Sequence, residues 1–273
     1  TVRRVCGFET NLLSGHTLKI ISAKTAASLA ADLVLLVPGA ITPQSICEAL
    51  ERGEGRWLHP KPIDPAGLSF QDMLQRLIEV TSSWEDAFHL REGRAATDDK
   101  PLYPGLRRPQ VGALHAALAH ATRSTDPATI VMPTGTGKTE TMLALNASQR
   151  FERLLVVVPT DALREQIAAK FETFGVLKAQ YCLDASALFP VVTRLTRIPK
   201  SIAEVDQIFD SANVIVTTMH IAGRAEPPVQ EHMAARASAL FIDEAHHIGA
   251  RTWASFRGLF AERTPPIPVV QFT

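Results

Sequence analysis

The stretch MPTGTGKT at residues 132–139 has a composition suited to phosphate binding, and it lies between an apolar run and a helical pattern. Gly135 and Gly137 let the backbone turn with its N–H groups inward, where these groups and the positive helix end hold phosphate oxygens. Lys138 would reach the β- and γ-phosphates, and the Thr139 hydroxyl would bind Mg²⁺. The residues predicted to bind the nucleotide here are Pro133, Thr134, Gly135, Thr136, Gly137, Lys138, Thr139 and Glu140.

A pair of carboxylates ends the apolar run LFIDEAHH at residues 240–247. A carboxylate at the end of a buried strand is costly unless it has a partner or a task. Beside a phosphate-binding loop, Asp243 would hold Mg²⁺, and Glu244 would orient and deprotonate an attacking water. His246 would sense the γ-phosphate. The alternative is an ordinary strand end with two solvated acids, and the two histidines lack the ligand spacing of a metal site.

Five short apolar runs alternate with helical stretches such as 161–174, a pattern typical of βαβ units. Because the runs lack polar alternation, they predict a mainly parallel sheet with helices on both faces. The expected fold is therefore α/β, a RecA-like domain that carries its ligand at the carboxyl ends of its strands. The five runs are 128–132, 153–158, 213–218, 239–244 and 268–273.

Residues 1–90 predict a small α/β accessory domain of unknown role. The polar stretch 91–105 contains two prolines and two glycines and is interpreted as a linker, followed by the ATP-binding domain at 106–273. The elements expected in the small domain are strands at 17–22 and 33–38 and helices at 42–53 and 69–80.

The composition is that of a globular protein: 46% of the 273 residues are hydrophobic, and the formal net charge is zero. A wholly basic surface is excluded, although a local basic groove is not. The three cysteines are widely spaced and support neither a disulfide framework nor a zinc site. No apolar stretch is long enough to span a membrane, so we expect a cytoplasmic protein without a membrane partner.

These motifs together resemble the first motor domain of superfamily 2 DEAD/DEAH-box helicases, in the branch of the type III restriction subunits (ResIII). The segment LRRPQVGAL at 106–114 resembles the glutamine motif, which implies that Gln110 reads adenine. A solvated first-turn residue is the other interpretation of this glutamine. VVVPTDALREQ at 156–166 and VIVTTMH at 214–220 resemble the motifs that grip a sugar-phosphate backbone. The matching nucleic-acid contacts are Thr160, Arg164, Thr217 and Thr218.

The resemblance implies an ATP- and Mg²⁺-dependent translocase or helicase, acting on duplex DNA in a restriction or phage-defence system. Nuclease or other defence-complex subunits are the implied partners. VVQFT at 269–273 is similar to the start of motif III, so we expect the second motor domain to be missing and this chain alone to be inactive. The alternatives are an RNA helicase of the same fold and a nucleotide-dependent scaffold or switch in a nuclease complex.

Overall fold

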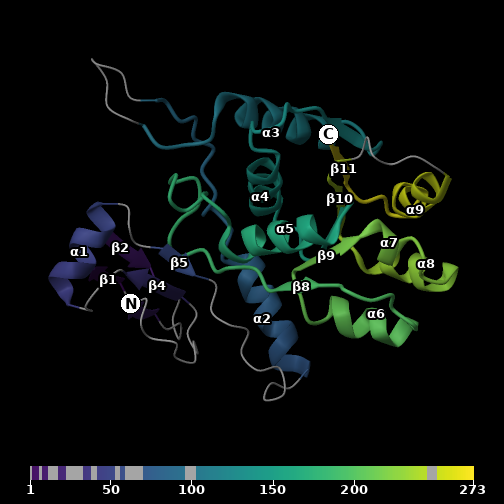
Figure 1. Ribbon diagram of the computed structural model, residues 1–273, viewed down its shortest axis with the longest axis horizontal. Coiled ribbons are helices and arrows are strands. Elements are labelled where there is room, and N and C mark those ends of the chain that lie inside the picture. The colour runs from purple at the N-terminus through teal and green to yellow at the C-terminus, as the bar shows by residue number, and fades with distance from the viewer. Residues whose placement is uncertain are drawn as a thin grey trace.

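The computed structural model describes residues 2–5, 8–11, 18–22, 33–37, 42–52, 56–58, 70–95, 103–244 and 251–273. A six-stranded sheet forms the centre of the larger part of the chain (Figure 1). Every neighbouring pair of its strands is parallel, which confirms the predicted parallel sheet. In spatial order the strands are β6 (Ala128–Ile130), β11 (Val269–Phe272), β10 (Ala239–Ile242), β7 (Leu154–Val158), β9 (Val214–Thr218) and β8 (Val192–Arg194).

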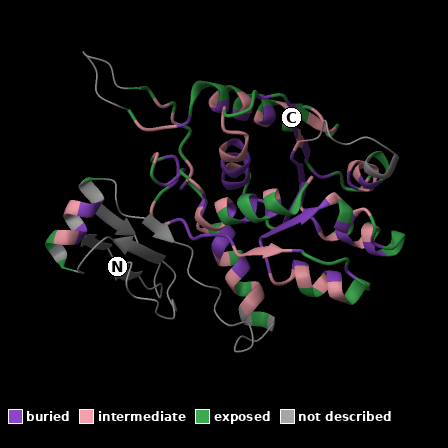
Figure 2. Cartoon of the chain, viewed as in Figure 1, coloured by how far each residue is buried: buried purple, intermediate pink, exposed green. Residues whose placement is uncertain are grey.

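Helices cover both faces of this sheet, because alternate residues of each strand point to opposite sides. In β7, Leu154, Val156 and Val158 belong to one buried cluster, with α3 (Arg108–Ala121), α4 (Lys138–Gln149) and α5 (Asp161–Thr173). Leu155 and Val157 belong to a second cluster on the other face. Its helices are α6 (Ile202–Phe209), α7 (Met219–Ala222), α8 (Pro227–Arg236) and α9 (Arg251–Ala261). The strands β7, β9 and β10 are accordingly buried along their whole length, whereas β8 at the edge of the sheet is half-buried (Figure 2).

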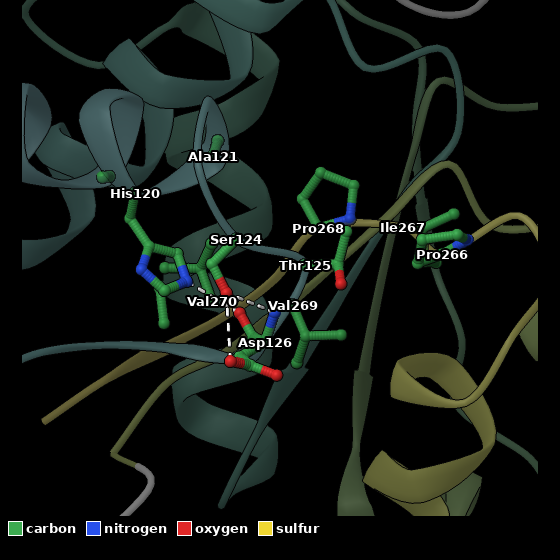
Figure 3. Close-up of a pocket in the computed structure, with 12 residues that line it drawn as sticks. His120, Ala121, Ser124, Thr125, Asp126, Pro266, Ile267, Pro268, Val269 and Val270 are labelled. Atoms are coloured by element: carbon green, nitrogen blue, oxygen red, sulfur yellow. Dashed lines mark hydrogen bonds between the residues drawn. The ribbon is translucent and has the colours of Figure 1, made fainter.

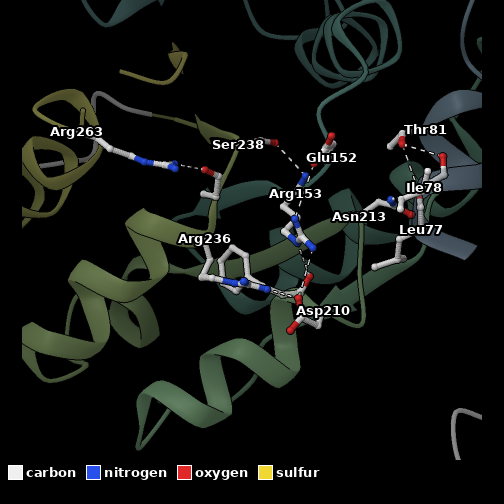
Figure 4. Close-up of polar contacts among 12 residues, drawn as sticks. Leu77, Ile78, Thr81, Glu152, Arg153, Asp210, Asn213, Arg236, Ser238 and Arg263 are labelled. Atoms are coloured by element: carbon white, nitrogen blue, oxygen red, sulfur yellow. Dashed lines mark hydrogen bonds and ion pairs between the residues drawn. The ribbon is translucent and has the colours of Figure 1, made fainter. Parts of the chain in front are cut away.

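Arg153 fixes the amino-terminal end of β7 through three elements (Figure 4). Its backbone N–H donates to Ser238 Oγ at 2.9 Å, and its Nε donates to the carbonyl of Phe209 at 3.1 Å. Asp210 pairs with Arg153 at 3.4 Å and also with Arg236 of α8. These contacts hold α6 and α8 at the amino-terminal end of the sheet. They do not involve the carboxyl ends of the strands, where ligands of parallel sheets bind.

Helix α2 (Phe70–Ser82) and the residues after it pack into the core of the larger unit. Val80 and Trp84 are buried there, and Trp84 Nε1 donates to the carbonyl of Leu188 at 2.7 Å. Within the helix, the carbonyl of Leu77 accepts a hydrogen bond of 3.1 Å from Asn213 Nδ2 (Figure 4). A division of the chain at 91–105 remains a proposal, and the structure adds that residues 77–87 share the core of the unit that follows.

The two ends of the segment 91–105 are hydrogen-bonded to each other where the structure describes them. Gly93 N–H donates to the carbonyl of Leu106 at 2.7 Å, and Arg94 and Tyr103 exchange two backbone bonds of 2.8 and 3.0 Å. Leu106 N–H in turn donates to the carbonyl of Arg91 at 2.8 Å. This pairing brings residues 103–106 to a defined place beside α3.

The amino-terminal residues form two small sheets on one side of the larger unit (Figure 1). In the second sheet β3 and β4 are parallel and β4 and β5 are antiparallel. The Thr42 hydroxyl accepts a hydrogen bond of 3.1 Å from Ser45 N–H at the start of α1, as its position before a helix predicts. The elements are β1 (Val2–Val5), β2 (Phe8–Asn11), β3 (Leu18–Ser22), β4 (Leu33–Val37), α1 (Pro43–Glu51) and β5 (Arg56–Leu58).

Candidate nucleotide-binding site

The segment 133–137 forms a tight loop between β6 and α4, as the motif predicts. Gly135 and Gly137 have φ angles of +81° and +95°, in the left-handed region that favours glycine. Thr136 closes the loop, because its Oγ1 donates to the carbonyl of Pro133 at 2.6 Å. The loop therefore opens α4 at Lys138 with the backbone conformation that a phosphate site requires.

Gln110 lies directly against this loop and is only 5% exposed. Its Oε1 accepts from Arg107 N–H at 2.7 Å, and its Nε2 donates to the carbonyl of Gly137 at 3.3 Å. A Cβ on Gly137 would stand 1.9 Å from that Nε2, so the contact itself demands glycine. The interpretation of Gln110 as a solvated first-turn residue is therefore wrong. Its proposed adenine contact would come from a side chain that already bonds to the loop.

Met132 occupies the position where such loops usually begin with glycine. Its side chain is 4% exposed and belongs to the core between the sheet and α4. Thr141 Oγ1 lies 3.6 Å from the methionine sulfur and 3.2 Å from the carbonyl of Gly137. Met132 thus packs beneath the loop and leaves the phosphate side of the loop to backbone N–H groups.

Lys138 and Glu244 form an ion pair at the carboxyl ends of the strands. Their side chains are 14% and 23% exposed, and Asp243 beside them is 5% exposed. Glu244 has a φ of +51°, a conformation that costs a non-glycine residue about 1 kcal/mol or more and is found most often at functional sites. The structure thus brings the two predicted motifs together, while His246 lies outside the described residues.

A cavity of about 490 Å³ opens over the loop and the carboxylate pair. Of the predicted nucleotide-binding residues, Gln110, Thr134, Gly135, Gly137, Lys138, Thr139 and Glu140 line it, together with Asp243 and Glu244. Sequence reasoning missed the rest of the wall, which is made by Gly105, Leu106, Arg107, Leu163, Gln166, Lys170, Val176 and Gln180.

Three of the missed residues had a signal in the sequence. Leu163, Gln166 and Lys170 are spaced by three and four residues on the helix predicted at 161–174, so they share one face. Lys170 forms an ion pair with Glu140 of α4, which places this face over the loop. Val176 and Gln180 follow the helix in an irregular segment, where no periodicity indicates which way a side chain points.

A second, smaller cavity of about 160 Å³ lies at the amino-terminal ends of β6 and β11 (Figure 3). His120, at the end of α3, contributes its ring, and His120 Nε2 lies 2.8 Å from the carbonyl of Asp126. Ligands of parallel α/β sheets bind at the carboxyl ends of the strands. This position distinguishes it from the cavity over the loop.

The four predicted nucleic-acid contacts lie at the start of α5, which follows β7, and at the end of the neighbouring strand β9, but they differ in their surroundings. Thr160 caps α5 and accepts from Leu163 N–H at 3.3 Å, while Thr218 ends β9, the strand beside β7. Thr217 is fully buried, and Thr218 is only 3% exposed. Arg164 is 7% exposed and pairs with Asp161 at 2.6 Å and Glu165 at 3.1 Å, so it is not an exposed helix charge.

Oxygen ligands for a hard cation are available beside the loop. Thr139 and Asp243 line the same cavity, and hydroxyl and carboxylate oxygens are ligands that Mg²⁺ accepts. Within the described residues no three His, Cys, Asp or Glu side chains gather as a metal site. The donor set fits a cation that is shared with phosphate oxygens and waters, which is the usual manner of Mg²⁺ binding.

Residues 104–273 match the family model described as the type III restriction enzyme, res subunit. The chain belongs to this family. No curated protein matches the sequence. As a member of the res subunit family, the chain carries a helicase-type domain with the loop, carboxylates and sheet described above. In the described part of the chain, no helix has the length and apolar composition needed to cross a bilayer.

Two solved structures are similar to this res subunit domain. One is a nuclease-deletion mutant of the Type ISP restriction-modification enzyme LlaGI in complex with a DNA substrate mimic, with 17% identity and a TM-score of 0.36. The other is the Hef helicase domain of Pyrococcus furiosus, with 20% identity and a TM-score of 0.38. Each alignment covers 62% of this chain, but only 17% of the LlaGI chain and 34% of the Hef chain.

Proposed function

We propose that this chain is the ATP-binding motor domain of a DNA translocase or helicase. The observation that carries the proposal is the Lys138–Glu244 ion pair at the mouth of a glycine-rich loop, within a cavity of about 490 Å³. A lysine and a carboxylate could be replaced by apolar residues at such a half-buried strand end without loss of stability. A phosphate-handling site needs both.

The residues suggest a division of roles. Lys138 would neutralise the β- and γ-phosphates, and Thr139 and Asp243 would hold Mg²⁺, which shields charge on the transferred phosphoryl group. Glu244 would orient and deprotonate the attacking water. Gln110 would lie at the adenine, and His246 at the γ-phosphate.

The ion pair also links the two proposed roles. Lys138 donates to Glu244 Oε1, so the ammonium that should meet phosphate is held by the carboxylate that should meet water. A bound triphosphate competes for Lys138 and releases Glu244 for its own task. Activation of the base is thereby coupled to occupation of the loop.

Duplex DNA is the proposed nucleic-acid partner, because the family is defined by restriction enzymes. Thr160 and Thr218 lie at the carboxyl ends of adjacent strands, where two hydroxyl-bearing positions would follow one sugar-phosphate backbone. Such contacts are independent of sequence and weaken as salt rises. A nuclease or another defence-complex subunit is the proposed protein partner.

Calorimetric titration of ATP and Mg²⁺ into the wild-type chain and three variants tests the proposal. Lys138→Ala should weaken ATP binding at least tenfold, because it removes the charge on the phosphates. Glu244→Gln should bind ATP as well as the wild type or better, because Lys138 is released. Where the wild type hydrolyses ATP, this variant should lose a factor of about 10²–10⁴ in rate.

Lys200→Ala is the matched control, since Lys200 is exposed and is not among the residues that line the cavity. A wild-type chain that binds no ATP would contradict the proposal. So would a Lys138→Ala variant that binds ATP as tightly as the Lys200→Ala control.

A further inference from the structure

Two segments beside the phosphate loop, residues 103–107 and 174–189, line part of the cavity, and a third segment, residues 83–94, is hydrogen-bonded to both. We call the three segments together the side wall. The wall contributes Gly105, Leu106, Arg107, Val176 and Gln180 to the cavity lining. With a triphosphate on residues 133–139, the nucleoside must occupy the rest of the cavity. The side wall and the face of α5 that carries Leu163, Gln166 and Lys170 are then the surfaces available to the base.

A side-chain hydrogen bond joins the segments 103–107 and 174–189. Gly105 N–H donates to Gln180 Oε1 at 2.8 Å. Because a backbone N–H can only donate, the amide oxygen of Gln180 must face Gly105. A Cβ on Gly105 would lie 2.5 Å from Gly93 N, so Gly105 is pressed against the segment 91–94 on its other side.

The segment that carries Gln180 is itself fixed. Lys178 is buried and donates to the carbonyls of Ala185, at 3.0 Å, and Ala187. Tyr181 has a φ of +53°, which a tyrosine adopts only when its surroundings impose it. His89 N–H donates to the carbonyl of Cys182 at 2.9 Å, which ties the turn to the segment 83–94. Gln180 thus projects from a rigid support.

We propose that Gln180 is a positioning residue for the nucleotide base. Through Gly105 it fixes residues 105–107 as the surface on which a purine packs, and Arg107 extends this surface to the loop, where its Nη1 donates to the carbonyl of Gly135 at 2.9 Å. The inference rests on the proposed ATP site. It assigns selectivity for the base to a segment that follows α5 and that the motifs do not include.

The test compares ATP with inorganic tripolyphosphate, which reaches the loop but has no base. Gln180→Met keeps the length of the side chain and removes the acceptor, while Gln180→Glu keeps an acceptor for Gly105 N–H. The measured quantity is the dissociation constant of ATP divided by that of tripolyphosphate. An added charge at residue 180 affects the binding of both anions, so its effect on this ratio largely cancels.

Gln180→Met should weaken ATP relative to tripolyphosphate by about tenfold, the weight of one donor left unsatisfied. Gln180→Glu should keep the wild-type ratio. Hydrogen exchange should show the Gly105 amide protected in the wild type and in Gln180→Glu, and unprotected in Gln180→Met. Should Gln180→Met not fold, the same inference requires ATP, but not tripolyphosphate, to increase protection of the wild-type Gly105 amide.

The outcomes separate this inference from the proposed function. A wild type that binds neither anion overturns both. A wild type that binds both, with an unchanged ratio in Gln180→Met, overturns the role of Gln180 alone. The role of Gln180 is also overturned if Gln180→Glu weakens ATP relative to tripolyphosphate as much as Gln180→Met does. The amide nitrogen, and not the link to Gly105, would then be responsible.

Discussion

Gly137 in the phosphate loop and Gly112 in α3 differ in their backbone conformation and in the space around them. Gly137 has a φ of +95° and no room for a Cβ beside Gln110, whereas a Cβ on Gly112, within α3, would meet nothing within 4 Å. Gly137→Ala should therefore destabilise the fold by about 1–3 kcal/mol and abolish nucleotide binding. Gly112→Ala should stabilise it by up to about 1 kcal/mol, because alanine is the better helix former.

Chemical denaturation of both glycine variants measures the stability changes, and an ATP titration measures the binding. Equal stability of the two variants would contradict the conformation described for the loop. So would full ATP affinity in Gly137→Ala.

The surroundings of Lys178 change its pKa, which gives the stability of the protein a measurable pH dependence. Burial lowers its pKa from 10.5 to about 7, although the nearby Asp184 acts in the opposite direction. Its Nζ lies 4.3 Å from the centre of the Phe189 ring and bonds to two carbonyls. Between pH 7 and 10.5 the folded state therefore holds Lys178 mostly neutral, while the unfolded chain holds it protonated.

The sign of the pH dependence follows from proton counting. Because the unfolded state binds more protons in this window, the free energy of unfolding should rise with pH, by at most about 1.4 kcal/mol per pH unit from this group. Below pH 7 both states are protonated and the contribution is flat. Urea denaturation of the wild type and Lys178→Met at pH 6, 7, 8 and 9 checks this. Above pH 7 the free energy of unfolding of the wild type should increase relative to that of Lys178→Met. A difference between the two proteins that does not depend on pH would refute the lowered pKa of Lys178.

Residues that carry chemistry were predictable where their spacing is dictated by the ligand. Lys138, Thr139 and the carboxylates at 243–244 follow from what phosphate and Mg²⁺ require, and the structure brings them to one cavity. The bond between Gln110 and Gly137 could not be predicted, because it depends on how α3 approaches the loop. For Arg164 the sequence shows two acids nearby but not whether the side chain turns to them or to solvent.

At the level of elements, α2 is the helix whose place the sequence least revealed. Its own amphipathic pattern predicted it correctly, but the proline- and glycine-containing stretch after it suggested a boundary. Val80, Trp84 and Ala87 are all buried in the core shared with α4 and α5. The strand β8 was missed for another reason: it has three residues and pairs only at the edge of the sheet.

Shortening the chain tests where its cooperative unit begins. A chain that starts at residue 70 should melt close to the temperature of residues 1–273, because it retains Val80, Trp84 and Ala87. A chain that starts at residue 106 should be strongly destabilised. Loss of Trp84 alone should cost about 3–5 kcal/mol, against a total stability of about 5–15 kcal/mol for a typical domain.

Trp84→Ala in the whole chain is the control, because it removes the same contact without shortening the sequence. Melting followed by circular dichroism compares the four proteins. A chain starting at 106 that melts with the full-length chain would show that the boundary lies at 91–105, as the sequence suggested.

At the scale of the whole molecule, the layered α/β arrangement was the most predictable property. Apolar runs of five residues without polar alternation have few places to go except the interior of a parallel sheet, and β7, β9 and β10 are buried throughout. The pairing order was not predictable, because nothing within β6 indicates that its neighbour is β11. Register and neighbours depend on contacts between distant segments.

That pairing also sets the order in which the molecule can be assembled during synthesis. Among the strands that the structure describes, β6 pairs with β11 alone, and the contact between Thr129 and Gln271 joins residues 142 positions apart. At about 5–20 residues per second, a ribosome needs roughly 7–30 s to make the intervening chain. Until then the phosphate loop follows a strand that has no partner in the sheet, so we expect that ATP cannot assist the folding of the nascent chain. We therefore expect nucleotide binding at this loop to require that β11 has been made and has paired with β6.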